Sequence, residues 1–90
     1  MKIGQIIKER YEIVEILGEG GMAFVYKAKD KQLQRNVAIK TLKPNYVNQE
    51  TFVDRFKREA KTAANLNHPN IVQIFDWGIE EEPYFVMEYI

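Results

Sequence analysis

The sequence predicts an α+β domain, in which one main helix packs on a five-stranded twisted antiparallel sheet. Two observations lead to this fold class. Five short stretches are rich in β-branched and aromatic residues, and turns of polar residues, glycine or proline separate them. One longer stretch, between the third and fourth of these, carries apolar residues at helical spacing. The expected order is strand, strand, strand, helix, strand, strand, and the short links favour antiparallel pairing.

Turn residues set the boundaries of the expected strands. Gly18-Glu19-Gly20-Gly21 follows the first strand, a polar turn from Asp30 to Arg35 follows the second, and Pro44 ends the third. A turn from Glu80 to Pro83 separates the last two. The strands are therefore expected over residues 11–17, 24–29, 36–42, 71–78 and 84–89.

The helix is expected over residues 50–66. Asn48 is a suitable N-cap, and Glu50 places a negative charge in the first turn, where the helix dipole favours it. His68-Pro69-Asn70 ends the helix.

Composition limits the classes of function. Ninety residues form one domain, and 13 basic residues balance 13 acidic ones, so no net charge draws the chain to nucleic acid or to an anionic membrane. There is no cysteine and one histidine, which excludes disulfides, thiolate metal sites and histidine-rich metal sites. The sequence shows neither a membrane-length apolar run nor a signal peptide, which suggests a cytoplasmic setting.

A glycine pattern lies between the first two expected strands. Gly18-x-Gly20-x-x-Ala23 nearly matches the loops that let a backbone approach phosphate oxygens. Alone, this pattern is better explained by a plain hairpin turn. A dinucleotide-binding loop would have to open into a helix, whereas this one opens into Phe24-Val25-Tyr26, and the Gly-Lys-Ser/Thr of a Walker A loop is absent.

Two charged residues stand out against apolar surroundings. Lys40 follows Val37-Ala38-Ile39 in a strand, so Ala38 and Lys40 point to the same face. On the helix, Glu59 lies inside the apolar stripe formed by Phe52, Phe56, Ala63 and Leu66. A buried carboxylate needs a partner, and Lys40 is the best candidate. The alternatives are that Lys40 snorkels at a strand edge and that Glu59 reaches water at the edge of the stripe.

Together these elements resemble the small lobe of protein kinases, specifically of bacterial eukaryotic-like (Hanks-type) serine/threonine kinases. Residues 17–30 resemble the glycine-rich loop of that branch, of which Gly-Gly-Met-Ala is typical. Val37-Ala38-Ile39-Lys40 resembles the strand-three lysine motif, and Arg55-Phe56-Lys57-Arg58-Glu59-Ala60 resembles the central helix. His68-Pro69-Asn70-Ile71-Val72 and Met87-Glu88-Tyr89-Ile90 resemble the entry to the next strand and the hinge. The spacings also agree, at 40 − 18 = 22 and 59 − 40 = 19 residues.

The resemblance implies a role for each matched residue. Lys40 would hold the α- and β-phosphates of ATP and be oriented by Glu59, and these two are the expected catalytic residues. Val72 would line the rear of the site, the backbones of Glu88 and Ile90 would meet the adenine edge, and Ala63 would stack with Ile74. The expected ATP-binding residues are Leu17, Gly18, Glu19, Gly20, Gly21, Met22, Ala23, Val25, Ala38, Lys40, Val72, Met87, Glu88 and Ile90.

The family also uses H-R-D…N and D-F-G motifs, which position the substrate hydroxyl and bind Mg²⁺. Neither occurs in these residues, and the sequence reaches the hinge at Ile90. Residues 1–90 are thus expected to form the kinase N-lobe without its C-lobe, to contain no metal ligands, and to be inactive alone. The alternative functions are a nucleotide-binding module without chemistry and a dimerisation module.

The resemblance also implies partners. The protein substrate would bind through the C-lobe, and the whole kinase could be membrane-anchored. A homodimer is expected through Arg10, Leu33 and Asp76, or through a C-lobe-facing surface on which these apolar residues would be partly uncovered: Phe56, Ala63, Ile74, Val86 and Met87.

Overall fold

The computed structural model describes residues 1–65, 73–80 and 82–89, with only the backbone described over residues 60–65. The α+β class and the order of the main elements are confirmed, but the sheet has six strands rather than five. The elements are β1 (Ile6–Ile7), β2 (Tyr11–Glu19), β3 (Ala23–Asp30), β4 (Arg35–Leu42), a 3-10 helix (Pro44–Tyr46), α1 (Glu50–Asn65), β5 (Ile74–Ile79) and β6 (Pro83–Glu88).

The additional strand is β1, which pairs antiparallel with the start of β2. A strand of two residues shows no alternation in the sequence, so periodicity could not reveal it. Its position depends on a turn in which Lys8 and Glu9 both adopt positive φ, at 54° and 55°. Non-glycine residues seldom adopt this conformation, and the sequence carries no glycine or asparagine there to indicate it.

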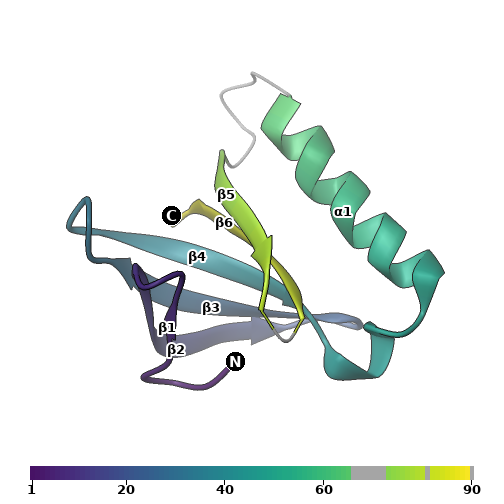
Figure 1. Ribbon diagram of the computed structural model, residues 1–90, viewed down its shortest axis with the longest axis horizontal. Coiled ribbons are helices and arrows are strands. Elements are labelled where there is room, and N and C mark those ends of the chain that lie inside the picture. Colours follow the sequence, from purple (N-terminus) through teal and green to yellow (C-terminus); the bar gives the residue numbers. More distant parts are fainter. Residues whose placement is uncertain (66–72, 81, 90) are drawn as a thin grey trace.

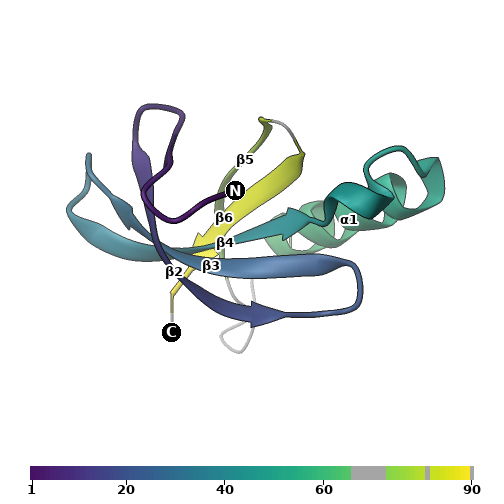
Figure 2. The ribbon, with the colours of Figure 1, turned by 90° about the horizontal axis from the view of Figure 1, so that it is seen from below.

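The sheet is antiparallel throughout, in the order β1-β2-β3-β4-β6-β5, and it curls strongly (Figures 1 and 2). Side chains join its two edges. Lys8 Nζ, just after β1, lies 3.0 Å from Asp76 Oδ1 in β5, and the Tyr11 hydroxyl in β2 donates to Asp76 Oδ2 at 3.2 Å. These contacts link the two ends of the sheet along one side, so the sheet closes partway into a small barrel.

Two apolar clusters occupy the two faces of the sheet. The interior of the curl is the larger cluster, and its buried members are Ile7, Tyr11, Ile13, Tyr26, Ala28, Val37, Ile39, Tyr84 and Val86. On the opposite face, Phe56 of α1 packs with Leu42 of β4 and Phe85 of β6, which we call the helix-side cluster. Figure 1 shows α1 flanking the sheet beside β5 and away from β1. The helix thus covers only part of one face.

Several boundaries differ from those expected. Gln49 rather than Asn48 directly precedes α1, and the Gln49 carbonyl accepts hydrogen bonds from the N–H groups of Phe52 and Val53, at 3.0 and 3.1 Å. The His68-Pro69-Asn70 signal and the expected start of the fourth strand at Ile71 lie outside the described residues. Among the residues described, α1 is neither long nor apolar enough to be a membrane span.

Candidate functional site

The strand register gathers five of the predicted site residues on one face of the sheet. Gly18 pairs with Val25, Val25 with Lys40, and Lys40 with Phe85, which forms one cross-strand row. In the next row, Ala38 pairs with Met87. Cross-strand partners point to the same side of a sheet. Gly18, Val25, Ala38, Lys40 and Met87 therefore share the face opposite the interior of the curl.

Two irregularities in β2 make this arrangement possible. The register between β2 and β3 shifts between Ile13 and Glu15 and again between Ile16 and Gly18, which leaves Val14 and Leu17 as the extra residues. Each shift exchanges the faces of the residues that follow, because side chains alternate along a strand. Leu17, one of the predicted ATP-binding residues, is one of the extra residues and is 43% exposed. Its availability for a ligand thus depends on a bulge that alternation does not predict.

The predicted contact between Lys40 and Glu59 is confirmed. Lys40 Nζ lies 2.5 Å from Glu59 Oε1 and 5.9 Å from the ring centroid of Phe85. The expectation that this pair is buried was wrong, because the side chains are 25% and 46% exposed. The helix meets the sheet through Phe56, whereas Glu59, three residues later, is exposed to solvent. The ammonium is thus oriented by the helix while part of it stays accessible.

The glycine loop between β2 and β3 closes through a hydrogen bond from the Gly20 N–H to the Ala23 carbonyl, at 2.8 Å. A Cβ atom at Gly18 or Gly21 would meet nothing within 4 Å, and at Gly20 its nearest neighbour would be the Ala23 oxygen at 3.9 Å. None of these three glycines has a positive φ. Neither crowding nor a positive φ therefore requires glycine at these positions, and the bare backbone leaves room for a ligand to approach closely.

The loop is attached to the rest of the sheet at its tip. Met22 packs against the helix-side cluster, and Ala23 is buried and pairs with Leu42. The backbone N–H of Lys43 donates to the Met22 carbonyl at 2.8 Å, and Lys43 Nζ lies 2.6 Å from Glu19 Oε1. No local sequence pattern indicates Lys43, because 24 residues separate the ion-pair partners along the chain.

The remaining predicted positions are only partly described. The Glu88 N–H donates to the Gln73 carbonyl at 2.9 Å, so only the Glu88 carbonyl could meet an adenine edge. Val72 and Ile90 lie outside the described residues, as does the side chain of Ala63, so the expected stacking of Ala63 on Ile74 cannot be placed. Among the described residues, no group of three or more histidine or acidic side chains could hold a metal ion.

The expected C-lobe-facing surface is less apolar than predicted. Phe56 and Val86, which were expected to be partly uncovered, are buried, at 2% and 0% exposed. Phe56 is covered by the sheet itself, and Val86 points into the curl. Ile74 and Met87 are half-buried against the helix-side cluster.

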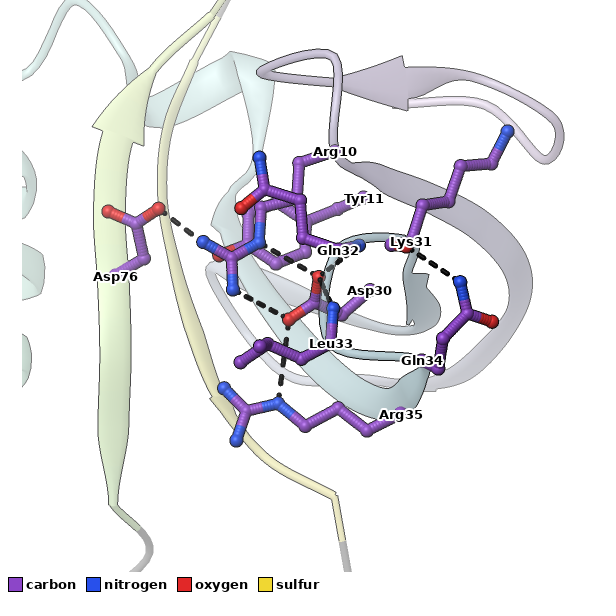
Figure 3. Close-up of polar contacts among 9 residues, drawn as sticks. All are labelled: Arg10, Tyr11, Asp30, Lys31, Gln32, Leu33, Gln34, Arg35 and Asp76. Atoms are coloured by element: carbon purple, nitrogen blue, oxygen red, sulfur yellow. Dashed lines mark hydrogen bonds and ion pairs between the residues drawn. The ribbon is translucent and has the colours of Figure 1, made fainter.

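A second polar cluster surrounds Asp30, at the turn between β3 and β4 (Figure 3). The Arg10 guanidinium donates to both carboxylate oxygens at 2.8 Å, and Arg35 Nε lies 3.5 Å from Oδ2. The backbone N–H groups of Gln32 and Leu33 also donate to Oδ1, at 3.0 and 3.2 Å. The hydrogen bonds from Arg10, followed by those from the backbone, hold the pKa of the Asp30 carboxyl well below its ordinary value.

The residues expected at a dimer interface lie in or beside this cluster. Arg10 and Asp76 are engaged within the chain, Arg10 with Asp30 and Asp76 with Lys8 and Tyr11. Burial and the charge of Asp76 raise the pKa of Tyr11 to about 12. Leu33 is 57% exposed on the same turn. The turn that Asp30 holds through its hydrogen bonds therefore presents the exposed apolar side chain of Leu33.

Comparison with known proteins adds independent observations. The model of the protein kinase domain family matches residues 11–90. The chain is 52% identical over 91 aligned residues to the serine/threonine-protein kinase PrkC of Bacillus subtilis, and 46% identical to the serine/threonine-protein kinase PknB of Mycolicibacterium smegmatis. All of the chain is covered in both cases, but only 14% and 15% of those relatives.

Solved structures also resemble this chain over nearly its whole length. The Mycobacterium tuberculosis PknI kinase domain superposes with a TM-score of 0.78 at 30% identity, over 100% of this chain and 36% of that one. The apo form of PpkA-294 superposes with a TM-score of 0.84 at 27% identity, over 99% of this chain and 38% of that one. The chain thus spans just over a third of the length of these two solved chains.

Proposed function

Because this chain belongs to the protein kinase domain family, we propose that it is the ATP-binding small lobe of a bacterial serine/threonine protein kinase. The observation that supports this most strongly is the Lys40–Glu59 ion pair, whose lysine lies in the same cross-strand row as Gly18 and Val25. One cation is thereby placed beside a loop whose backbone is open to a ligand.

The arrangement of Lys40, Glu59 and the glycine loop suits a nucleoside triphosphate. Glu59 orients Lys40 toward the α- and β-phosphates, and the backbone from Gly18 to Ala23 covers them. Leu17, Val25, Ala38 and Met87 provide an apolar surface for the adenine. Phosphoryl transfer depends mostly on positioning and on neutralising charge, and this lobe would provide the cover and one positive charge.

Mg²⁺ neutralises the phosphates in this family. No group of side chains among the described residues could bind this ion. We place its ligands, the residue that orients the substrate hydroxyl and the protein-substrate groove in a C-lobe that these 90 residues do not contain. The lobe would work in the cytoplasm, where ATP is available, and residues 1–90 alone would not transfer phosphate.

The test measures binding of an ATP analogue and phosphorylation of a generic protein substrate by the full-length protein. Lys40→Met is expected to lower the phosphorylation rate by about a hundredfold or more, since it removes the charge that positions the phosphates. Lys29→Met is the matched control. Lys29, in β3, lies on the same face of the sheet as Lys40, and its side chain is exposed. Equal activities of the two variants would contradict the proposal.

The same experiment separates the alternative functions. A nucleotide-binding module without chemistry would bind the analogue in a Lys40-dependent manner but phosphorylate nothing. A dimerisation module would do neither.

We also propose a homodimer through Arg10, Leu33 and Asp76, supported by the exposed side chain of Leu33 on the turn that the Arg10–Asp30 ion pair holds. Leu33→Asp is expected to shift the sedimentation of the full-length protein toward the monomer. Identical sedimentation of the variant and the parent protein at all concentrations would exclude this interface.

A further inference from the structure

The glycine loop contains a carboxylate in an electrostatically unfavourable place. Glu19 lies between Gly18 and Gly20, two of the residues whose backbone is proposed to cover the phosphates. Its side chain is 60% exposed and, because Glu19 pairs with Phe24, lies on the opposite face of the strand from Gly18 and Val25, so its charge acts on the ligand across the loop backbone. Like charges repel, so an unpaired carboxylate here would oppose the binding of any anionic ligand.

Lys43 compensates this charge from a different part of the fold. It follows β4, and its ammonium lies 2.6 Å from Glu19 Oε1. The Lys43 side chain is only 17% exposed, and Nζ lies 5.1 Å from the centroid of the Phe24 ring. The cation is therefore held in place by packing before any ligand arrives, which lowers the entropy cost of the ion pair.

The backbone of Lys43 holds the same loop independently. Its N–H donates to the Met22 carbonyl at 2.8 Å, and this bond does not depend on the side chain. Substitution of the Lys43 side chain thus removes the charge while leaving the backbone attachment of the loop in place.

We propose that Lys43 is a positioning residue of the phosphate-covering loop, which neutralises Glu19 so that the loop meets the nucleotide without a net negative charge. This inference rests on the proposed function, because it takes the ligand of the loop to be a nucleotide polyphosphate. Lys43 acts through Glu19 and does not itself contact the phosphates.

The test is a double-mutant cycle in the full-length protein, with the KM for ATP and kcat measured separately at low and high salt. Lys43→Met keeps the length of the side chain and is expected to raise the KM for ATP about fivefold, with a much smaller change in kcat. Glu19→Gln is expected to lower the KM, since it leaves the Lys43 charge uncompensated. The combined variant should return close to the parent value, and Lys43→Arg should also retain it.

Salt provides a second readout. Because the effect is electrostatic, the difference between Lys43→Met and the parent protein should shrink as ionic strength rises. A purely structural role for Lys43 would be insensitive to salt and would not be rescued by Glu19→Gln.

Three outcomes would overturn the inference. If the combined variant binds ATP as weakly as Lys43→Met does, Lys43 acts on the nucleotide directly or by packing. If Lys43→Met leaves the KM unchanged, Lys43 has no role in nucleotide binding. If the parent protein binds no ATP, the proposed function fails as well, which distinguishes that result from the other two.

Discussion

The two faces of the sheet are built differently. Among the residues that the structure describes, nine buried apolar side chains fill the interior of the curl, which is closed at its edges by hydrogen bonds to Asp76. The helix-side cluster has three buried members among the side chains described, surrounded by half-buried ones such as Met22 and Met87. The residues proposed to bind ATP lie on this second face. The described part of the molecule thus combines a well-packed scaffold with a sparsely packed functional face, where small movements cost less free energy.

The largest effect on stability is expected in the interior. Ile39→Ala removes a fully buried side chain of β4 and should lower the free energy of unfolding by about 2 to 5 kcal/mol. Met87→Ala, on the other face, removes a half-buried side chain and should cost clearly less. Urea denaturation of both variants measures the difference. Equal losses would mean that the two faces are packed alike.

Phe56→Leu tests the helix-side cluster. It shortens the main contact of α1 with the sheet and should cost about 1 kcal/mol. Phe56 holds α1, including Glu59 one turn later, against the sheet. Its substitution should therefore accelerate amide hydrogen exchange in α1 more than in β3 and β4. Uniform acceleration throughout the lobe would show that helix and sheet unfold as one unit.

The contribution of Asp30 is expected to be smaller than that of Ile39 and to depend on pH. The pKa of the Asp30 carboxyl is lowered from its ordinary value of 3.8, mainly by Arg10. The stabilisation is therefore complete above that value and is lost as the pH falls below it, when the folded carboxyl becomes protonated. Asp30→Asn should remove this component, and its acid unfolding curve below about pH 4 should be flatter than that of the parent protein. Parallel curves would contradict the assignment.

The smallest effect on stability is expected for the proposed catalytic pair. Lys40 and Glu59 are 25% and 46% exposed, so Glu59→Gln should change the free energy of unfolding by less than about 1 kcal/mol. Phosphorylation by the full-length protein should nevertheless fall strongly, because Lys40 loses the group that orients it. Large destabilisation with retained activity would reverse the proposed roles of the two faces.

Periodicity and motif spacing in the sequence were sufficient for the fold class, for the helix and for five of the six strands. Alternation placed Ala38 and Lys40 on one face, and the helical stripe selected Glu59 as the partner of Lys40; both relations hold in the structure. These predictions succeeded because each depends on a pattern that repeats along a continuous stretch of chain.

The tertiary structure alone decided the curl of the sheet, the bulges that present Leu17, the exposure of Glu59 and the contact of Lys43 with Glu19. Bulges break the alternation from which faces are predicted, and solvent exposure depends on which neighbours pack around a residue. Ion pairs between distant residues form only where the register of the strands and the path of the turns bring their charges together. Such properties belong to the packing of elements against one another, and no local stretch of sequence carries them.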